Sequence, residues 1–107
     1  MDANISTKTR KLIYCRDGYR CALCDSTQYL QVHHLIPRGH GGSDHPYNLI
    51  CLCSTCHAQA HGINAYDEPD FDPSFIEQAM IEYLADYYAD SGDWNPWRKD
   101  SEPWRRE

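Results

Sequence analysis

Apolar and polar residues alternate with changing periods along this chain, and the first stretch predicts a helix. Ser6 or Thr7 can cap it, because their hydroxyls accept hydrogen bonds from the free amides at a helix start. The helix should run to about Asp17, since Gly18 is typical of a position where a helix ends. The side chains expected to face inward are Leu12, Ile13 and Cys15.

The middle of the chain predicts a strand, a loop, a second strand and a short helix. Residues 29–36, YLQVHHLI, and residues 48–52, NLICL, have the β-branched, aromatic and apolar composition of strands. A short helix capped by Ser54 or Thr55 should follow the second strand. Residues 37–47 join the two strands through a loop of turn formers, namely Pro37, Gly39, Gly41, Gly42, Ser43, Asp44 and Pro46.

The second half begins with residues 63–73, an acidic connector that contains two prolines. Ser74 and Glu77 form an S-x-x-E capping box, which predicts a helix over residues 74–90. Its apolar side chains share one face, which we expect to pack on the rest of the chain, and its acidic side chains share the other. These are Ile76, Met80, Tyr83, Leu84 and Tyr87 on the first face, and Glu82, Asp86 and Asp90 on the second.

The tail, residues 91–107, places three tryptophans among prolines and charges: Trp94, Trp97 and Trp104. Because tryptophan is rare in disordered segments, part of this tail should dock on the rest of the chain. At 107 residues the chain is expected to be one small domain, of the size that often needs a metal or disulfide staple. We divide it into a core with its N-terminal helix (1–62), a connector (63–73), a packed helix (74–90) and the tail.

The net charge of −6 argues against a nucleic-acid binder, but the charge is unevenly distributed. Residues 1–61 carry six Lys and Arg against four Asp, a net of +2, and residues 62–107 carry twelve acids against four bases, a net of −8. A basic front and an acidic rear fit a protein that presents one face to phosphate. The alternative for the rear half is a solvated acidic helix and tail.

Apolar runs in this sequence are all much shorter than the roughly 20 residues that span a bilayer. The polar N-terminal stretch, MDANISTKTRK, also lacks the apolar region of a signal peptide. We therefore expect no membrane association, and a soluble cytoplasmic protein in a reducing compartment. Cysteines in such a compartment bind metal more often than they form disulfides.

Two CxxC pairs predict a structural zinc site made by Cys21, Cys24, Cys53 and Cys56. Thiolates two residues apart on a turn can occupy adjacent corners of a tetrahedron, and a second pair completes it. The alternatives are two disulfides or a redox pair. A classical finger with two cysteines and two histidines is excluded, because His57 directly follows the second pair. The remaining cysteines, Cys15 and Cys51, are expected to be buried, and strand alternation points Cys51 away from Cys53.

Four of the six histidines are organised in pairs. His57 and His61 lie one turn apart on the expected helix, so both can bind one metal ion. His33 and His34 are adjacent on a strand and must point to opposite faces, which suggests that one binds metal and the other works across from it. A second structural zinc site is the alternative, although it would not need Asn48 or the Gly-Gly loop. The loop histidines, His40 and His45, are expected to be exposed.

These motifs together resemble the HNH endonuclease family, in its zinc-containing bacterial and phage form, over about residues 12–62. The residues that carry the resemblance are Cys21-Ala22-Leu23-Cys24, Val32-His33-His34-Leu35-Ile36-Pro37, Gly41-Gly42, Asn48-Leu49-Ile50 and Cys53-Ser54-Thr55-Cys56-His57. The resemblance implies the ββα-metal fold, a hairpin and a helix around one metal ion, within a small α+β domain that also contains a four-cysteine zinc clamp and flanking helices. Residues 1–62 would then be the nuclease core.

Roles follow from the resemblance by position. It implies that His34 is the general base, that His33 and His57 are ligands of a catalytic metal ion, and that Asn48 ties the loop together and orients the base. His61 matches a further ligand of the colicin nuclease branch. On physical grounds, phosphodiester hydrolysis needs an activated water and neutralisation of phosphate charge, which an imidazole and one divalent ion can supply. We expect the base to be held by a backbone carbonyl on one ring nitrogen.

The expected function is hydrolysis of DNA by nicking or double-strand cleavage, with 5′-phosphate and 3′-hydroxyl products, in a bacterial or phage-infected cell. The expected cofactors are structural Zn²⁺ and a catalytic Mg²⁺, Mn²⁺ or other divalent transition ion. The candidate DNA contacts are Arg38 beside the site, which could equally be a solvated loop residue, and Arg20, Arg16 and Lys11 in the basic front. Contacts to the backbone predict weak sequence preference.

A competing hypothesis is a non-catalytic zinc module that binds DNA or acts as an adaptor. The acidic rear half and its tryptophans favour a protein partner, which would bind residues 74–107. A nuclease that acts inside a phage DNA-packaging complex would combine both hypotheses. Against the purely non-catalytic alternative, the positions of the base and of the metal ligands are all filled.

Overall fold

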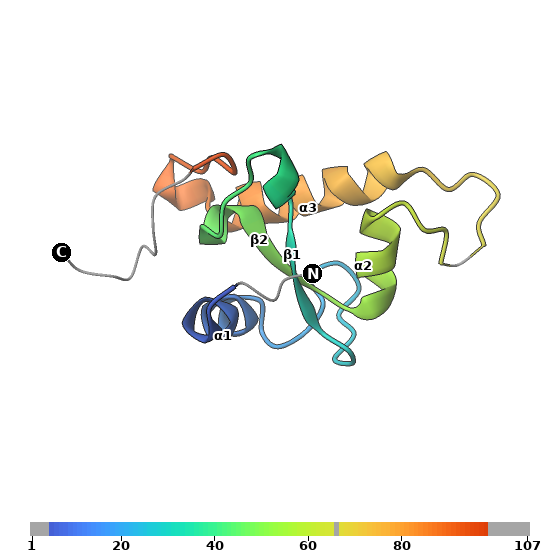
Figure 1. Cartoon of the computed structure of the whole chain (residues 1–107), viewed down its shortest axis with the longest axis horizontal. Coiled ribbons are helices and arrows are strands. Elements are labelled where there is room, and N and C mark those ends of the chain that lie inside the picture. Colours follow the sequence, from blue (N-terminus) through green and yellow to red (C-terminus); the bar gives the residue numbers. More distant parts are fainter. Residues whose placement is uncertain (1–4, 66, 99–107) are drawn as a thin grey trace.

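Two strands form an antiparallel hairpin that lies between helices on both faces (Figure 1). The computed structural model describes residues 5–65 and 67–98. In that part of the chain the elements are α1 (Thr7–Arg16), β1 (Gln31–His34), β2 (Leu49–Leu52), α2 (Ser54–Ala60) and α3 (Pro73–Tyr87), with 3-10 turns at Arg38–His40, Pro46–Asn48 and Ala89–Ser91. The predicted small α+β fold is confirmed. None of these helices is both long and apolar enough to cross a membrane.

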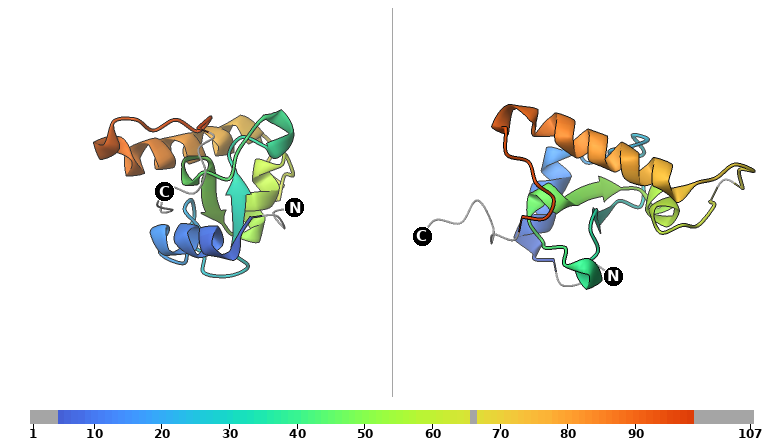
Figure 2. Two further views of the ribbon diagram at one scale, coloured as in Figure 1. Left: turned by 60° about the vertical axis from the view of Figure 1, so that its left-hand side comes forward. Right: turned by 90° about the horizontal axis from the view of Figure 1, so that it is seen from above.

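The pairing of the strands sends alternate side chains to two separate cores. His33 lies opposite Ile50, and His34 lies opposite Leu49. On one face, Val32, Leu49 and Cys51 pack with Ile5 and with Ile13 of α1. On the other face, Ile50 and Leu52 pack with the buried cysteines of the zinc motif and with Met80 and Leu84 of α3. The turned views show the hairpin between α1 and α3 (Figure 2).

Helix α1 begins as predicted, but fewer of its apolar side chains are buried against the hairpin than expected. Its cap is Ser6, whose Oγ accepts a hydrogen bond from the Thr9 amide at 3.1 Å. Ile13 is fully buried, but Leu12 is 38% exposed. Cys15 is exposed as well. The inward orientation predicted for Leu12 and Cys15 is therefore wrong. Each of them is rotated by about 100° or more around the helix axis from the buried Ile13, so its side chain lies outside the contact face.

The caps of the later helices differ from the prediction. Cys53 caps α2 through its sulfur, in place of Ser54 or Thr55. Helix α3 begins at Pro73 and is capped by Asp72, which accepts from the Ser74 amide at 3.0 Å, so the predicted capping box is wrong. Proline suits the first helical position, since its missing N–H would have no partner there.

The apolar face of α3 packs on the hairpin as predicted, although the helix ends at Tyr87, earlier than predicted. Met80 and Leu84 are buried, whereas Tyr87 at the end of the stripe is 51% exposed. Glu82 and Asp86 face solvent. The division of the chain into core, connector, helix and tail stays a prediction.

Part of the tail docks on the loop between the strands. The Trp94 indole Nε1 donates a hydrogen bond to the Tyr47 carbonyl at 3.0 Å, and the Ser43 hydroxyl donates to the Arg98 carbonyl. Trp97 is exposed, and Trp104 lies outside the described residues. The docked segment therefore braces the loop that carries the candidate site.

Gly42 lies where this loop comes closest to the end of β1. A Cβ atom at this position would be 1.7 Å from the Ile36 carbonyl oxygen and 2.9 Å from Asn48 Nδ2. Gly42→Ala should therefore destabilise the protein by about 2–3 kcal/mol, which lowers the melting temperature by roughly 10–20 °C. Thermal melting followed by circular dichroism would measure this.

Gly39→Ala is the matched control, because a Cβ atom there meets nothing within 4 Å. Equal melting temperatures for the two variants would contradict a steric role for Gly42.

Candidate active site and metal centre

The four cysteines of the CxxC pairs converge at one end of the hairpin. Their sulfurs all lie within 4.8 Å of one another, and the Sγ atoms of Cys24 and Cys53 are 3.6 Å apart. Cys21 and Cys24 come from the turn before β1, and Cys53 and Cys56 from the start of α2. All six cysteines of the chain are free thiols, so the predicted zinc ligands are not paired as disulfides.

The thiols of this cluster interact strongly. A hydrogen bond from Cys56 lowers the pKa of Cys21 to about 4, and the same bond raises the pKa of Cys56. Four sulfurs that converge within 4.8 Å of one another are the donor set of a structural zinc site, so these residues are suited to bind Zn²⁺. Cys51 lies outside the cluster in the other core, where burial raises its thiol pKa to about 12.

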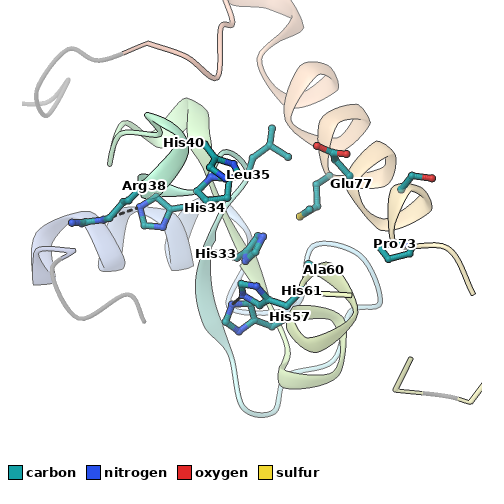
Figure 3. Close-up of a pocket in the computed structure, with 13 residues that line it drawn as sticks. His33, His34, Leu35, Arg38, His40, His57, Ala60, His61, Pro73 and Glu77 are labelled. Atoms are coloured by element: carbon teal, nitrogen blue, oxygen red, sulfur yellow. Dashed lines mark hydrogen bonds between the residues drawn. The ribbon is translucent and has the colours of Figure 1, made fainter. Parts of the chain in front are cut away.

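Three histidines form a second, separate cluster on the face of the hairpin that α2 covers (Figure 3). Nitrogen atoms of His33, His57 and His61 lie within 4.8 Å of one another, and the Nε2 atoms of His57 and His61 are 3.1 Å apart. Burial, followed by the nearby charges of His57 and His61, lowers the pKa of His33 to about 3. A neutral imidazole is the form that binds metal, so the residues present fit a divalent ion.

The histidine cluster opens into a cavity of about 500 Å³. The hairpin, the loop after β1, α2 and α3 supply its walls, with the lining residues His33, His34, Leu35, Pro37, Arg38, His40, His57, Ala60, His61, Pro73, Ser74, Glu77 and Met80. Glu77 was predicted only as a capping residue, and its place in the cavity results from the packing of α3 across the hairpin. The cysteine cluster is mostly buried, whereas the histidine cluster is accessible to a ligand.

His34 lines the same cavity without belonging to the histidine cluster. Its Nε2 atom is 2.8 Å from Asp44 Oδ1 and 3.4 Å from Arg38 Nε. Arg38 donates to both Asp44 oxygens, at 2.8 and 2.6 Å. We expected a backbone carbonyl to hold the base, and the partner of Nε2 is instead this carboxylate. The sequence marked Asp44 only as a turn former, because its approach to His34 depends on how the loop folds back.

Asn48 is fully buried and holds the loop by three side-chain hydrogen bonds. Its Oδ1 accepts from the Ile36 amide at 2.7 Å, and its Nδ2 donates to the carbonyls of Ile36 and Ser43 at 3.0 and 2.9 Å. These bonds join the two ends of the loop. His45 was expected to be exposed, but it is buried because its Nδ1 accepts from the Tyr47 amide as a turn cap. His40 is exposed at the cavity.

Arg16 has a structural position, which does not favour the predicted contact with DNA. Its side chain is only 4% exposed and pairs with the buried Asp17 at 2.8 Å. The guanidinium also donates to the carbonyls of Pro46 and Leu49 and to the Tyr88 hydroxyl. Arg16 therefore ties α1 to β2 and to the end of α3.

The other predicted DNA contacts differ in their surroundings. Lys11 is exposed on α1. Arg20 is exposed and lies 3.9 Å from Asp25 beside the cysteine cluster. Arg38 is half-exposed at the cavity and paired with Asp44. Of the three, only Arg38 lines the cavity, so contact of these residues with DNA stays a prediction.

A family model described as HNH endonuclease matches residues 21–62. This span contains the cysteine cluster, the histidine cluster, His34, Asp44 and Asn48. No solved structure matches the chain.

Two curated proteins are similar to parts of the chain. The type IV methyl-directed restriction enzyme EcoKMcrA of Escherichia coli (strain K12) is 46% identical over 39 residues, which are 36% of this chain and 14% of that enzyme. Anaredoxin of Nostoc sp. (strain PCC 7120) is 34% identical over 55 residues, which are 50% of this chain and 72% of that protein. The match therefore spans only a small part of the restriction enzyme but most of the second relative. With the family model placed on the two clusters and their loop, the chain belongs to the HNH endonuclease family.

Proposed function

We propose that this protein is a metal-dependent endonuclease that hydrolyses DNA phosphodiester bonds. One observation carries the proposal: the histidine cluster and His34 line a single open cavity, while the cysteine cluster lies apart from it. A purely structural second metal site would be closed by its ligands and would leave no room for a substrate. An open cluster beside an imidazole that is not one of its ligands suits hydrolysis.

His33, His57 and His61 would hold one divalent ion. Bound there, the ion would neutralise developing charge on the scissile phosphate and its leaving oxygen. Three imidazole donors favour a transition ion such as Ni²⁺ over Mg²⁺, because imidazole suits the later transition ions and magnesium prefers oxygen ligands. The four cysteines would hold Zn²⁺, which stabilises the fold without taking part in the reaction.

His34 acts as the general base in this proposal. It lines the cavity next to the candidate metal ligands, and a neutral imidazole can take a proton from the attacking water near physiological pH. Asn48 supports the base indirectly, because its hydrogen bonds fix the loop that follows β1. Cleavage would leave a 5′-phosphate and a 3′-hydroxyl.

The proposed substrate is DNA, in the cytoplasm of a bacterial or phage-infected cell. The family description and the restriction-enzyme relative support DNA as the substrate class, although the match covers 14% of that enzyme and does not transfer its methyl-directed action. Arg38, Arg20 and Lys11 are the candidate backbone contacts. Such contacts position a protein on DNA without reading its sequence, which is why we propose weak sequence preference.

The second candidate is a zinc-stabilised DNA-binding or adaptor module. The exposed acidic face of α3, with Glu82 and Asp86, favours a protein partner on this side of the molecule. A phage DNA-packaging complex that binds residues 74–107 would provide one, and a nuclease could also act within it.

A supercoiled-plasmid assay separates the two candidates. Zinc-loaded protein, freed of other divalent ions, should nick the plasmid after Mn²⁺ or Mg²⁺ is added and not before. Ligation of the nicked product by DNA ligase would verify the 5′-phosphate and 3′-hydroxyl ends. If added Mn²⁺, Mg²⁺, Co²⁺ and Ni²⁺ all leave the plasmid intact while zinc remains bound, the binding module is the better description.

A further inference from the structure

We propose that Asp44 is the positioning residue of His34, holding the proton of the imidazole on Nε2 so that Nδ1 carries the lone pair that accepts a proton. This inference rests on the proposed function. It adds the Asp44 carboxylate, which the sequence motifs do not include, to the residues proposed for the reaction. It is carried by the short contact between Asp44 and His34 and by the way the loop is held.

The two contacts to Nε2 imply opposite protonation of the ring. The nitrogen can donate to Asp44 Oδ1 at 2.8 Å, or it can accept from Arg38 Nε at 3.4 Å, but it cannot do both. An unprotonated Nε2 would direct its lone pair at a carboxylate oxygen 2.8 Å away, which is repulsive. The longer contact is outside the usual range for N–H hydrogen bonds. Nε2 therefore carries the proton, and in the neutral ring the lone pair belongs to Nδ1.

Arg38 fixes the orientation of the Asp44 carboxylate. Its NH2 group donates to Oδ1 at 2.8 Å and to Oδ2 at 2.6 Å, so the carboxylate accepts from a guanidinium and an imidazole together. Both partners of this ion pair are more than one-third exposed. Exposed ion pairs contribute only about 0–1 kcal/mol to stability. The role of this pair is therefore to orient the carboxylate toward His34.

The backbone on both sides of Asp44 is held by neighbouring groups. The Ser43 carbonyl accepts from Asn48 Nδ2 at 2.9 Å, and the Ser43 hydroxyl accepts from the His45 amide at 3.2 Å. Gly42 has no room for a Cβ atom, because the Ile36 carbonyl lies too close. Asn48 thus acts on His34 indirectly: it holds the Ser43 backbone, which positions the neighbouring Asp44 against the imidazole. This gives a physical path for the orienting role expected of Asn48.

The contact between Asp44 and His34 is of a kind that other enzymes use, in which a carboxylate accepts a hydrogen bond from a catalytic imidazole. The carboxylate selects the tautomer and stabilises the imidazolium formed when the ring accepts a proton. The proton moves from water to Nδ1 of His34, and the Nε2 proton remains between the ring and Asp44. Asp44 acts only through His34, as a positioning residue.

Asp44→Asn tests the inference with two readouts. The asparagine keeps the size of the side chain but loses its charge and can donate to Nε2, so it no longer enforces one tautomer. We expect kcat for plasmid nicking to fall by about 10- to 100-fold with KM changed less than about 2-fold. In the parent at pH 8, long-range ¹H–¹⁵N spectra should show the neutral His34 ring protonated on Nε2. The variant should show the Nδ1-protonated tautomer or a mixture.

Asp93→Asn is the matched control, because Asp93 also pairs with an arginine, Arg98 at 3.2 Å, but lies in the tail. It should retain parental kcat and the parental His34 tautomer. Asp44→Glu, which restores the charge, should recover part of the lost kcat.

Each outcome separates the inference from the proposed function. An active parent with unchanged kcat and tautomer in Asp44→Asn would overturn the inference alone. Higher activity or a lower KM in Asp44→Asn would also overturn it. Such a result would mean that the ion pair with Asp44 prevents Arg38 from binding the phosphate of the substrate. A parent that cuts no plasmid under any metal would sink the proposed function and the catalytic role of Asp44 with it, whatever the spectra show.

Discussion

His34→Ala should reduce metal-dependent plasmid nicking by about 100- to 10,000-fold while the protein keeps its structural zinc. This range is about what a positioned general base contributes to proton transfer. His34 lies outside both the cysteine cluster and the histidine cluster, so its removal leaves both sets of candidate metal ligands in place. Initial nicking rates, zinc content and thermal melting of parent and variant would measure the effect.

His40→Ala is the matched control for this prediction. His40 lines the same cavity from its exposed rim, and no catalytic role is proposed for it. It should keep nicking within a few-fold of the parent. Equal rates for His34→Ala and the parent would show that another group takes the proton.

Cys53→Ser should unfold the domain. Cys53 contributes twice, as one of the four clustered sulfurs and as the N-cap of α2, where its Sγ accepts from the Cys56 amide at 3.5 Å. Structural zinc provides on the order of 10–16 kcal/mol to small zinc domains, which matches or exceeds the roughly 5–15 kcal/mol that separates folded from unfolded states. Helix α2 and its C-cap also carry His57 and His61, so the candidate active site should be lost with it.

Cys15→Ser provides the control, since Cys15 is exposed on α1 and takes no part in the cluster. It should bind the same amount of zinc as the parent and melt cooperatively at the same temperature. Elemental analysis and thermal melting would compare the three proteins. Full zinc content and a cooperative transition in Cys53→Ser would contradict a structural metal at these cysteines.

The candidate site was predictable wherever local spacing determines geometry. A CxxC turn brings two sulfurs together, and a helix brings i and i+4 side chains to one face, whatever the rest of the fold does. Strand alternation likewise separated His33 from His34, and the structure places them with different partners. These inferences needed only the backbone periods of about 2 and 3.6 residues.

The exposure of several residues differs from what the sequence predicted. Arg16 has the charge of a DNA contact, but its side chain is buried. Its hydrogen bonds are accepted by the neighbouring Asp17 and by the carbonyls of Pro46 and Leu49. His45 was expected in solvent, and it is buried as the cap of a turn. Cys15 was expected in the core, and it is exposed. The burial of Arg16 depends on carbonyls 30 and 33 residues away in the sequence, whereas that of His45 accompanies a turn within its own loop.

The sequence by itself predicted the family, through the resemblance of its motifs. It also predicted the hairpin-and-helix core and the two clusters of candidate ligands, because these follow from short-range spacing. Only the tertiary structure decided which side of the hairpin α3 covers, that Glu77 lines the cavity, and that Asp44 meets His34. These contacts join residues on different elements or at the two ends of a folded loop. Their distances come from the packing of the whole domain, which no local pattern encodes.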